Sequence, residues 1–143
     1  ICQQAQLRTL PRPVAQCLIY PAVDGRMIDE SVTRYGEHLG LTRSLVFWFR
    51  DHYYRSREDA QQPLASPLLA ASVSGLPPAL VVVARDPLRD QGLAYAERLR
   101  HAGVRVETLD QDHLIHGFLT MGGAIPAARR AVLEICAAFG KML

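Results

Sequence analysis

Residues 79–90 read ALVVVARDPLRD, and this stretch decides the fold class. Its first six residues form a short, valine-rich apolar run, which predicts a strand buried on both faces. A Pro-Pro pair precedes the run, and Asp86-Pro87 closes it after Arg85. Because Pro87 disfavours helical geometry at the residue before it, we expect the Asp86 carboxylate on a loop directly after the strand.

Two further segments predict strands on either side of this one along the chain. Residues 15–20 (AQCLIY) form a second short apolar run bounded by prolines. From Val104 to Leu109, apolar and charged residues alternate, which predicts a strand with one solvated face, as expected near the edge of a sheet.

Helical patterns separate and follow these strands. Apolar spacing between Thr42 and Tyr54 indicates an amphipathic helix with Thr42 as its N-cap. Asp90 is the expected N-cap of the next helix, and Gly103 its expected left-handed C-cap. A closing helix has Pro126 in its first turn, a position that suits proline. Trp48, Phe49 and Tyr53 form a stripe in the first of these helices; we interpret it as core packing, with the alternative that one aromatic lines a pocket.

This alternation predicts an α/β fold with three mostly parallel strands, flanking helices and right-handed crossovers, built as one domain. The strand at 15–20 is apolar on both faces, so it calls for a neighbouring strand that the chain does not supply. Residues 1–7 read as the tail of a helix, which suggests that the chain begins in mid-fold. We therefore expect an incomplete sheet that belongs to a larger one.

Composition narrows the function classes. The 16 lysine and arginine residues are scattered and the net charge is +2, so we expect no nucleic-acid partner. No apolar stretch is long enough for a membrane span. Three cysteines without CxxC spacing are typical of reduced thiols in a cytoplasmic protein.

Chemistry-bearing residues gather after the second and third strands. Because the carboxyl ends of parallel strands face one crevice, Asp86 and the His116 of HLIHGF are expected close together. A metal cluster of His113 and His116 with Asp110 and Asp112 is a weaker alternative, and we expect no metal.

Several segments together resemble the C-terminal part of bacterial hormone-sensitive-lipase-like esterases and lipases, which have the α/β-hydrolase fold. They are AQCLIYP, SPLLA, SGLPPALVV, DPLRDQG, YAERLRHAGV and HLIHGF, in this order and spacing. The resemblance implies that residues 1–143 are the C-terminal part of a single hydrolase catalytic domain. It also implies that Asp86 is the acid and His116 the base of a Ser-His-Asp catalytic triad that needs no cofactor.

The nucleophilic serine of such a triad sits in a GxSxG elbow, and none of the serines here lies in that motif. The resemblance thus implies a hydrolase of small carboxylic esters whose N-terminal half, with the elbow, is absent, so that this chain alone is inactive. The alternative is a truncated, non-catalytic interaction or dimerisation domain; peptidase or lactonase chemistry also stays open. Related esterases imply a homodimer through the strand from Val104 to Leu109.

The residues next to Asp86 and His116 in the sequence suggest how the pocket and the acid loop are built. Leu88 and Ile115 flank the pair, and we expect them to border the substrate pocket or to anchor their loops. The approach to Asp86 is one residue shorter than the family pattern, and Gln111 and His113 stand where a Pro-Gly pair often precedes the histidine. These departures leave open a displaced acid loop.

Overall fold

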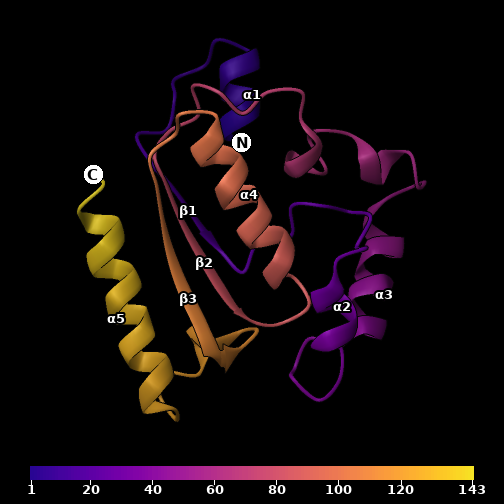
Figure 1. The fold of residues 1–143 in the computed structure, drawn as a ribbon, viewed down its shortest axis with the longest axis vertical. Coiled ribbons are helices and arrows are strands. Elements are labelled where there is room, and N and C mark those ends of the chain that lie inside the picture. Colours follow the sequence, from indigo (N-terminus) through magenta and orange to yellow (C-terminus); the bar gives the residue numbers. More distant parts are fainter.

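The computed structural model describes all 143 residues and has one open sheet of three parallel strands in the order β1-β2-β3 (Figure 1). The strands are β1 (Gln16–Ile19), β2 (Ala79–Arg85) and β3 (Val106–Ile115). The predicted α/β architecture and the parallel strands are confirmed. The third strand starts later than predicted and runs beyond its predicted end at Leu109, through the polar segment QDHLI.

The central strand β2 forms the middle of the core, and all of its residues from Ala79 to Ala84 are fully buried. Its side chains alternate between the two faces of the sheet, as the strand period requires. Val81 and Val83 pack on one face, and Leu80 and Val82 pack on the other. Burying each such side chain stabilises the fold by roughly 1.5–3 kcal/mol.

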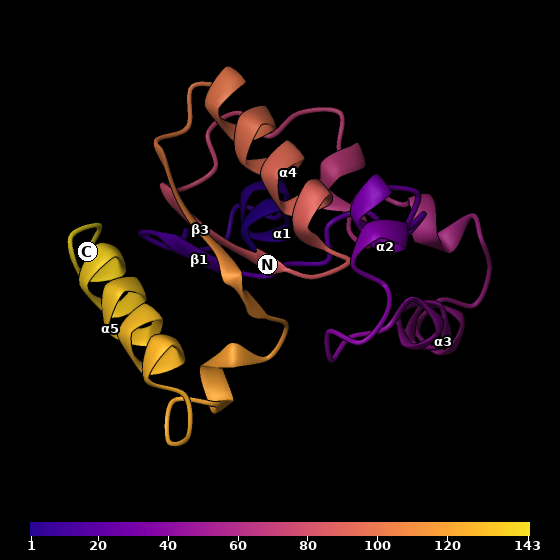
Figure 2. The ribbon, with the colours of Figure 1, turned by 60° about the horizontal axis from the view of Figure 1, so that its bottom comes forward.

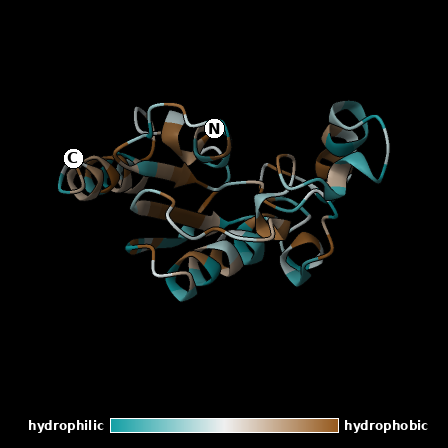
Figure 3. Ribbon diagram, turned by 90° about the horizontal axis from the view of Figure 1, so that it is seen from above, coloured by the Kyte–Doolittle hydropathy of each residue, from teal (hydrophilic) through white to brown (hydrophobic).

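Each face of the sheet is covered by one long helix, and the two helices lie on opposite sides of it (Figures 1 and 2). Helix α4 (Arg89–His101) packs Tyr95, Ala96 and Leu99 against one face. Helix α5 (Pro126–Gly140) packs Ala131 and Ile135 against the other. The hydropathy view shows the strands as a largely hydrophobic layer between helices of mixed character (Figure 3).

The remaining elements are short. They are the helices α1 (Cys2–Leu7), α2 (Glu30–Arg34) and α3 (Arg43–Tyr53) and three 3-10 turns. Turns η1 (Asp59–Gln61) and η2 (Pro67–Leu69) lie between α3 and β2, and η3 (Phe118–Thr120) lies between β3 and α5. Helices α2 and α3 lie together at the side of the molecule away from α5 (Figures 1 and 2). A small cluster that includes Met27, Leu41, Val46 and Leu88 joins this region to the start of α4.

Two of the three predicted caps are confirmed. The Thr42 hydroxyl accepts a hydrogen bond from the Leu45 N–H at 3.2 Å, and Gly103 after α4 has a φ of 78°. The predicted cap at Asp90 is wrong, because Leu88 holds the N-cap position of α4. The Asp90 carboxylate instead accepts the Ser31 N–H at 2.8 Å, so it caps helix α2 from a neighbouring helix.

The aromatic stripe of α3 does not pack in the core, which corrects the interpretation drawn from sequence. Trp48 and Phe49 are each 52% exposed and Tyr53 is 78% exposed. The helix buries Val46 instead, on the face that meets the small cluster. Helical spacing predicted the helix correctly, but it does not say which apolar face meets the rest of the molecule.

No helix in this structure combines the length and the apolar character that crossing a membrane requires. The three cysteines are all free thiols.

Candidate active site

A bulge in β3 sets the position of His116. Strand β3 pairs with β2 in step as far as Ala84 and Gln111, after which Arg85 pairs with Ile115. Three additional residues, 112–114, are therefore inserted in β3 at this point. Without the insertion the residue opposite Asp86 would be His113. The bulge re-aims the strand end, as bulges beside functional sites commonly do, and it places His116 next to Asp86.

The carboxylate of Asp86 and the imidazole of His116 form a close pair. Asp86 Oδ2 lies 2.7 Å from His116 Nδ1, and Asp86 Oδ1 accepts the Leu88 N–H at 2.9 Å. The Asp86 side chain is fully buried, whereas 27% of the His116 side chain is exposed. An ionised Asp86 keeps the proton on Nδ1, so that Nε2 presents its lone pair as a base.

The structure therefore brings together the two residues that the sequence singled out. The shorter approach to Asp86 leaves it within hydrogen-bond distance of His116. Asp86 is the only hydrogen-bond partner of the His116 ring in this chain.

Tyr20 holds the other side of the imidazole, and sequence reasoning missed it. Its ring centroid lies 4.4 Å from that of His116, and Phe118 packs edge-on against Tyr20 at 5.6 Å. The pKa of the Tyr20 phenol is raised, mainly by burial and also by the negative charge of Asp86. The signal in the sequence was the place of Tyr20 as the last residue of the apolar run AQCLIY, directly after β1.

Glycine shapes the chain on both sides of His116. Gly117 has a φ of 83°, which turns the chain from β3 into η3. A Cβ at Gly40 would lie 3.5 Å from Ile115 Cδ1 and 3.7 Å from the His116 carbonyl oxygen, so this backbone passes close to the site. Ile115 thus contacts the segment before α3.

An apolar hollow of about 540 Å³ opens at His116. Its walls are mainly hydrophobic and include Met27, Leu41, Phe49, Tyr53, Leu64 and Leu88. Of the two expected pocket residues, Leu88 lines the hollow, whereas Ile115 does not. Two aromatics of the α3 stripe, Phe49 and Tyr53, therefore face this hollow rather than the core.

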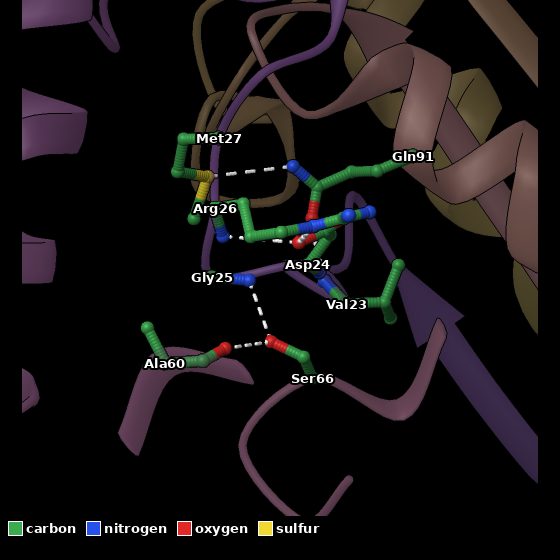
Figure 4. A network of polar contacts seen from close by, with 8 residues as sticks. All are labelled: Val23, Asp24, Gly25, Arg26, Met27, Ala60, Ser66 and Gln91. Atoms are coloured by element: carbon green, nitrogen blue, oxygen red, sulfur yellow. Dashed lines mark hydrogen bonds and ion pairs between the residues drawn. The ribbon is translucent and has the colours of Figure 1, made fainter. Parts of the chain in front are cut away.

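The loop after β1 forms one wall of the hollow and is held by a polar network (Figure 4). The side-chain oxygen of the fully buried Gln91 accepts the N–H groups of Val23 and Asp24, at 2.6 and 2.9 Å. The buried Asp24 carboxylate binds the backbone N–H and the guanidinium of Arg26. Asp24 therefore has a structural role, and its network fixes the loop that carries Met27.

The metal alternative finds no support in the geometry. Asp110 is paired with Arg89, and His113 Nδ1 lies 3.8 Å from Asp112 beside it in the bulge. No group of three or more His, Cys, Asp or Glu side chains is arranged to hold a metal ion.

Comparison with known proteins defines the class. A model of the family described as alpha/beta hydrolase fold matches residues 1–120, and the chain belongs to this family. The resemblance to hormone-sensitive-lipase-like esterases is thereby confirmed.

Individual relatives are ester hydrolases. The chain is 39% identical to the carboxylic ester hydrolase LipN of Mycobacterium tuberculosis, over 94% of this chain and 38% of that protein. It is 37% identical to the ethyl acetate hydrolase of Pseudomonas putida, over 99% of this chain and 45% of that protein. Among solved structures, an esterase of Pyrobaculum calidifontis matches 99% of this chain and 47% of its own, with 37% identity and a TM-score of 0.92. The chain thus spans less than half the length of these relatives.

Proposed function

We propose that this chain is the C-terminal part of a carboxylic ester hydrolase and supplies the acid, Asp86, and the base, His116, of a Ser-His-Asp triad. The observation that carries the proposal is the 2.7 Å contact between a fully buried carboxylate and a partly exposed imidazole. The imidazole opens onto an apolar hollow, where an acyl or alkyl group can bind. The ester hydrolases among the relatives support the same reaction class.

The two residues have separate tasks in this reaction. His116 Nε2 takes the proton of a serine hydroxyl as the serine oxygen attacks the ester carbonyl, and then gives it to the departing alcohol. When water hydrolyses the acyl-enzyme, His116 Nε2 takes a proton from the attacking water molecule and gives it to the departing serine oxygen. Asp86 holds the imidazole in the required tautomer and stabilises its charged form, without taking the proton itself.

The serine and part of the oxyanion hole come, in this proposal, from the N-terminal half of the hydrolase, which carries the GxSxG elbow. The chain alone would then be inactive, since neither Asp86 nor His116 can form the acyl-enzyme. A hollow of about 540 Å³ suits esters with short to medium acyl chains.

The test compares single variants of the full-length protein in the hydrolysis of 4-nitrophenyl butyrate. His116→Ala and Asp86→Asn should each lower kcat by about 10³-fold or more. The control is His113→Ala, because His113 lies three residues away with 58% of its side chain exposed. Labelling with a fluorophosphonate should report the reactive serine. Equal rates in all four proteins, or no labelling of the folded wild type, would contradict the proposal.

A second candidate function is a non-catalytic interaction or dimerisation domain. It is favoured by strand β3, which ends the sheet and pairs only with β2, so that its other edge can pair with a second chain. Ester hydrolysis by the full-length protein would exclude it, whereas a folded full-length protein without esterase activity would favour it.

Assembly through β3 belongs to the same proposal. Strand β3 ends the sheet and pairs only with β2, so its other edge has free backbone groups that a second copy can bind. Analytical ultracentrifugation should find a homodimer, and a proline at Thr108 in the middle of this edge should shift it toward the monomer. A strict monomer at high concentration would exclude this arrangement.

A further inference from the structure

A second hollow, of about 590 Å³, lies beside the apolar one and has a different lining. Arg50 and Tyr54 line both hollows, so the two adjoin along helix α3. Four arginines line the second hollow: Arg26, Arg50, Arg55 and Arg57. Asp51 is the only acidic residue in its lining.

The arginines of this hollow are not all neutralised. Arg26 pairs with Asp24 at 2.6 Å, and Arg50 pairs with Asp51 at 2.7 Å. Arg55 and Arg57 are exposed and form no ion pair with the chain. Two guanidinium groups two residues apart are therefore left with an uncompensated positive charge.

The neighbouring Glu58 does not complete the pairing. Its pKa is lowered first by a backbone hydrogen bond and then by the Ser56 hydroxyl, with a smaller effect from the charge of Arg57. Glu58 does not line the hollow.

Close packing fixes this arginine segment relative to the apolar hollow. A Cβ at Gly25 would lie 2.8 Å from Tyr54 Oη and 2.9 Å from the Ala60 carbonyl oxygen, so the loop after β1 touches both. The Ser66 hydroxyl accepts the Gly25 N–H at 2.7 Å and donates to the Ala60 carbonyl. The contacts of Ser66 with Gly25 and Ala60 therefore join the loop that walls the apolar hollow to η1, which directly follows the arginine segment (Figure 4).

From this arrangement we infer that the ester substrate carries an anionic group, a carboxylate at the end remote from the scissile bond. The apolar hollow takes the hydrocarbon part, and Arg55 and Arg57 bind the carboxylate. Guanidinium suits this task because its planar set of donors matches the two oxygens of a carboxylate. The inference rests on the proposed esterase function and narrows its substrate to half-esters of dicarboxylic acids.

The test uses pairs of substrates that differ only in charge. Mono-4-nitrophenyl adipate and suberate carry a terminal carboxylate, and their neutral partners carry a primary amide in its place. Full-length wild type and Arg55→Gln/Arg57→Gln are assayed for kcat/KM on each pair. The control is Arg129→Gln/Arg130→Gln, because both of these arginines are exposed on α5, which covers the opposite face of the sheet.

The wild type should prefer the carboxylate over the amide for at least one chain length. In the Arg55→Gln/Arg57→Gln variant, the ratio of kcat/KM for the carboxylate to kcat/KM for the amide should fall about fivefold. The control variant should keep the preference. Raising the ionic strength from about 0.01 to about 1 M should abolish it in the wild type, because the screening length falls from about 30 to about 3 Å.

Three results would overturn the inference. Hydrolysis of the amide without any preference for the carboxylate would refute the anionic substrate and leave the esterase function intact. An equal loss of preference in the control variant would show a general charge effect rather than a site. Folded protein that hydrolyses no member of either pair would refute the esterase function and this inference together.

Discussion

Replacing Gln91 with leucine should destabilise the protein by about 2–6 kcal/mol. Gln91 is fully buried, and its oxygen accepts the N–H groups of Val23 and Asp24 at 2.6 and 2.9 Å. Leucine is of similar size, so the main cost is two buried backbone donors left without a partner. Each such donor costs about 1–3 kcal/mol, which sets the range for the pair.

The assay is urea unfolding of the full-length protein followed by circular dichroism, with KM for a neutral ester measured under native conditions. KM should rise, because the loosened loop carries Met27, which lines the apolar hollow. Gln111→Leu is the matched control: Gln111 is also buried, but it donates only to the Glu134 side chain, at 2.8 Å. Gln111→Leu should lower the free energy of unfolding by only about 1 kcal/mol. Equal losses of stability in the two variants would refute the argument from orphaned backbone donors.

Two other predictions concern backbone conformation and pH. Gly117→Ala and Gly103→Ala should each lower the free energy of unfolding by about 1–2 kcal/mol, because both glycines have φ near 80° and neither new Cβ would clash. Only Gly117→Ala should lower kcat, because Gly117 adjoins His116. Equal kcat values in the two variants would contradict this prediction. Burial, helped by the charges of Asp24 and Asp90, raises the pKa of Asp29, so its contribution to stability is present below the unfolded pKa and is lost as the pH rises through the folded pKa. Asp29→Asn should therefore be more stable than the wild type at pH 7 and gain nothing near pH 3, and a gain independent of pH in thermal unfolding would refute the assignment.

The fold could be predicted from the sequence where a local pattern has one interpretation. The apolar run of β2 between Pro77-Pro78 and Asp86-Pro87 predicts a buried strand, and the structure buries all of the run. The alternation of strands and helices then leaves a parallel sheet as the consistent choice. Thr42 and Gly103 were predictable for the same reason, because each acts on the backbone within a few residues.

The incorrect predictions concern contacts between distant segments. Asp90 has the side chain of an N-cap, yet the N–H that it binds belongs to Ser31, far along the chain. The aromatic stripe of α3 indicated a buried face, but the helix meets the small cluster through Val46. In the C-terminal part of β3, most of residues 110–113 are exposed and polar. This part therefore lacks the apolar pattern that would have predicted a strand.

The sequence predicted the acid and the base of the candidate site, but not the residues that hold them and the neighbouring loop in place. Asp86 and His116 were identified by their place after strands and by the family resemblance, and they lie in contact. Tyr20 and Gln91 were not identified, because their importance arises from packing against residues far away in sequence. A side chain that acts through tertiary contacts has no local pattern of its own.

The three-residue bulge in β3 can become longer without moving the active-site residues. The residues on its two sides, Gln111 and Ile115, already face consecutive residues of β2, so the excursion begins and ends at neighbouring points in space. Asp112 and His113 project into solvent, and only Leu114 anchors the excursion to the core. We therefore expect insertions to be tolerated at Asp112 and His113. The same place is suited to a reporter group or a short epitope, because a longer excursion leaves His116 beside Asp86.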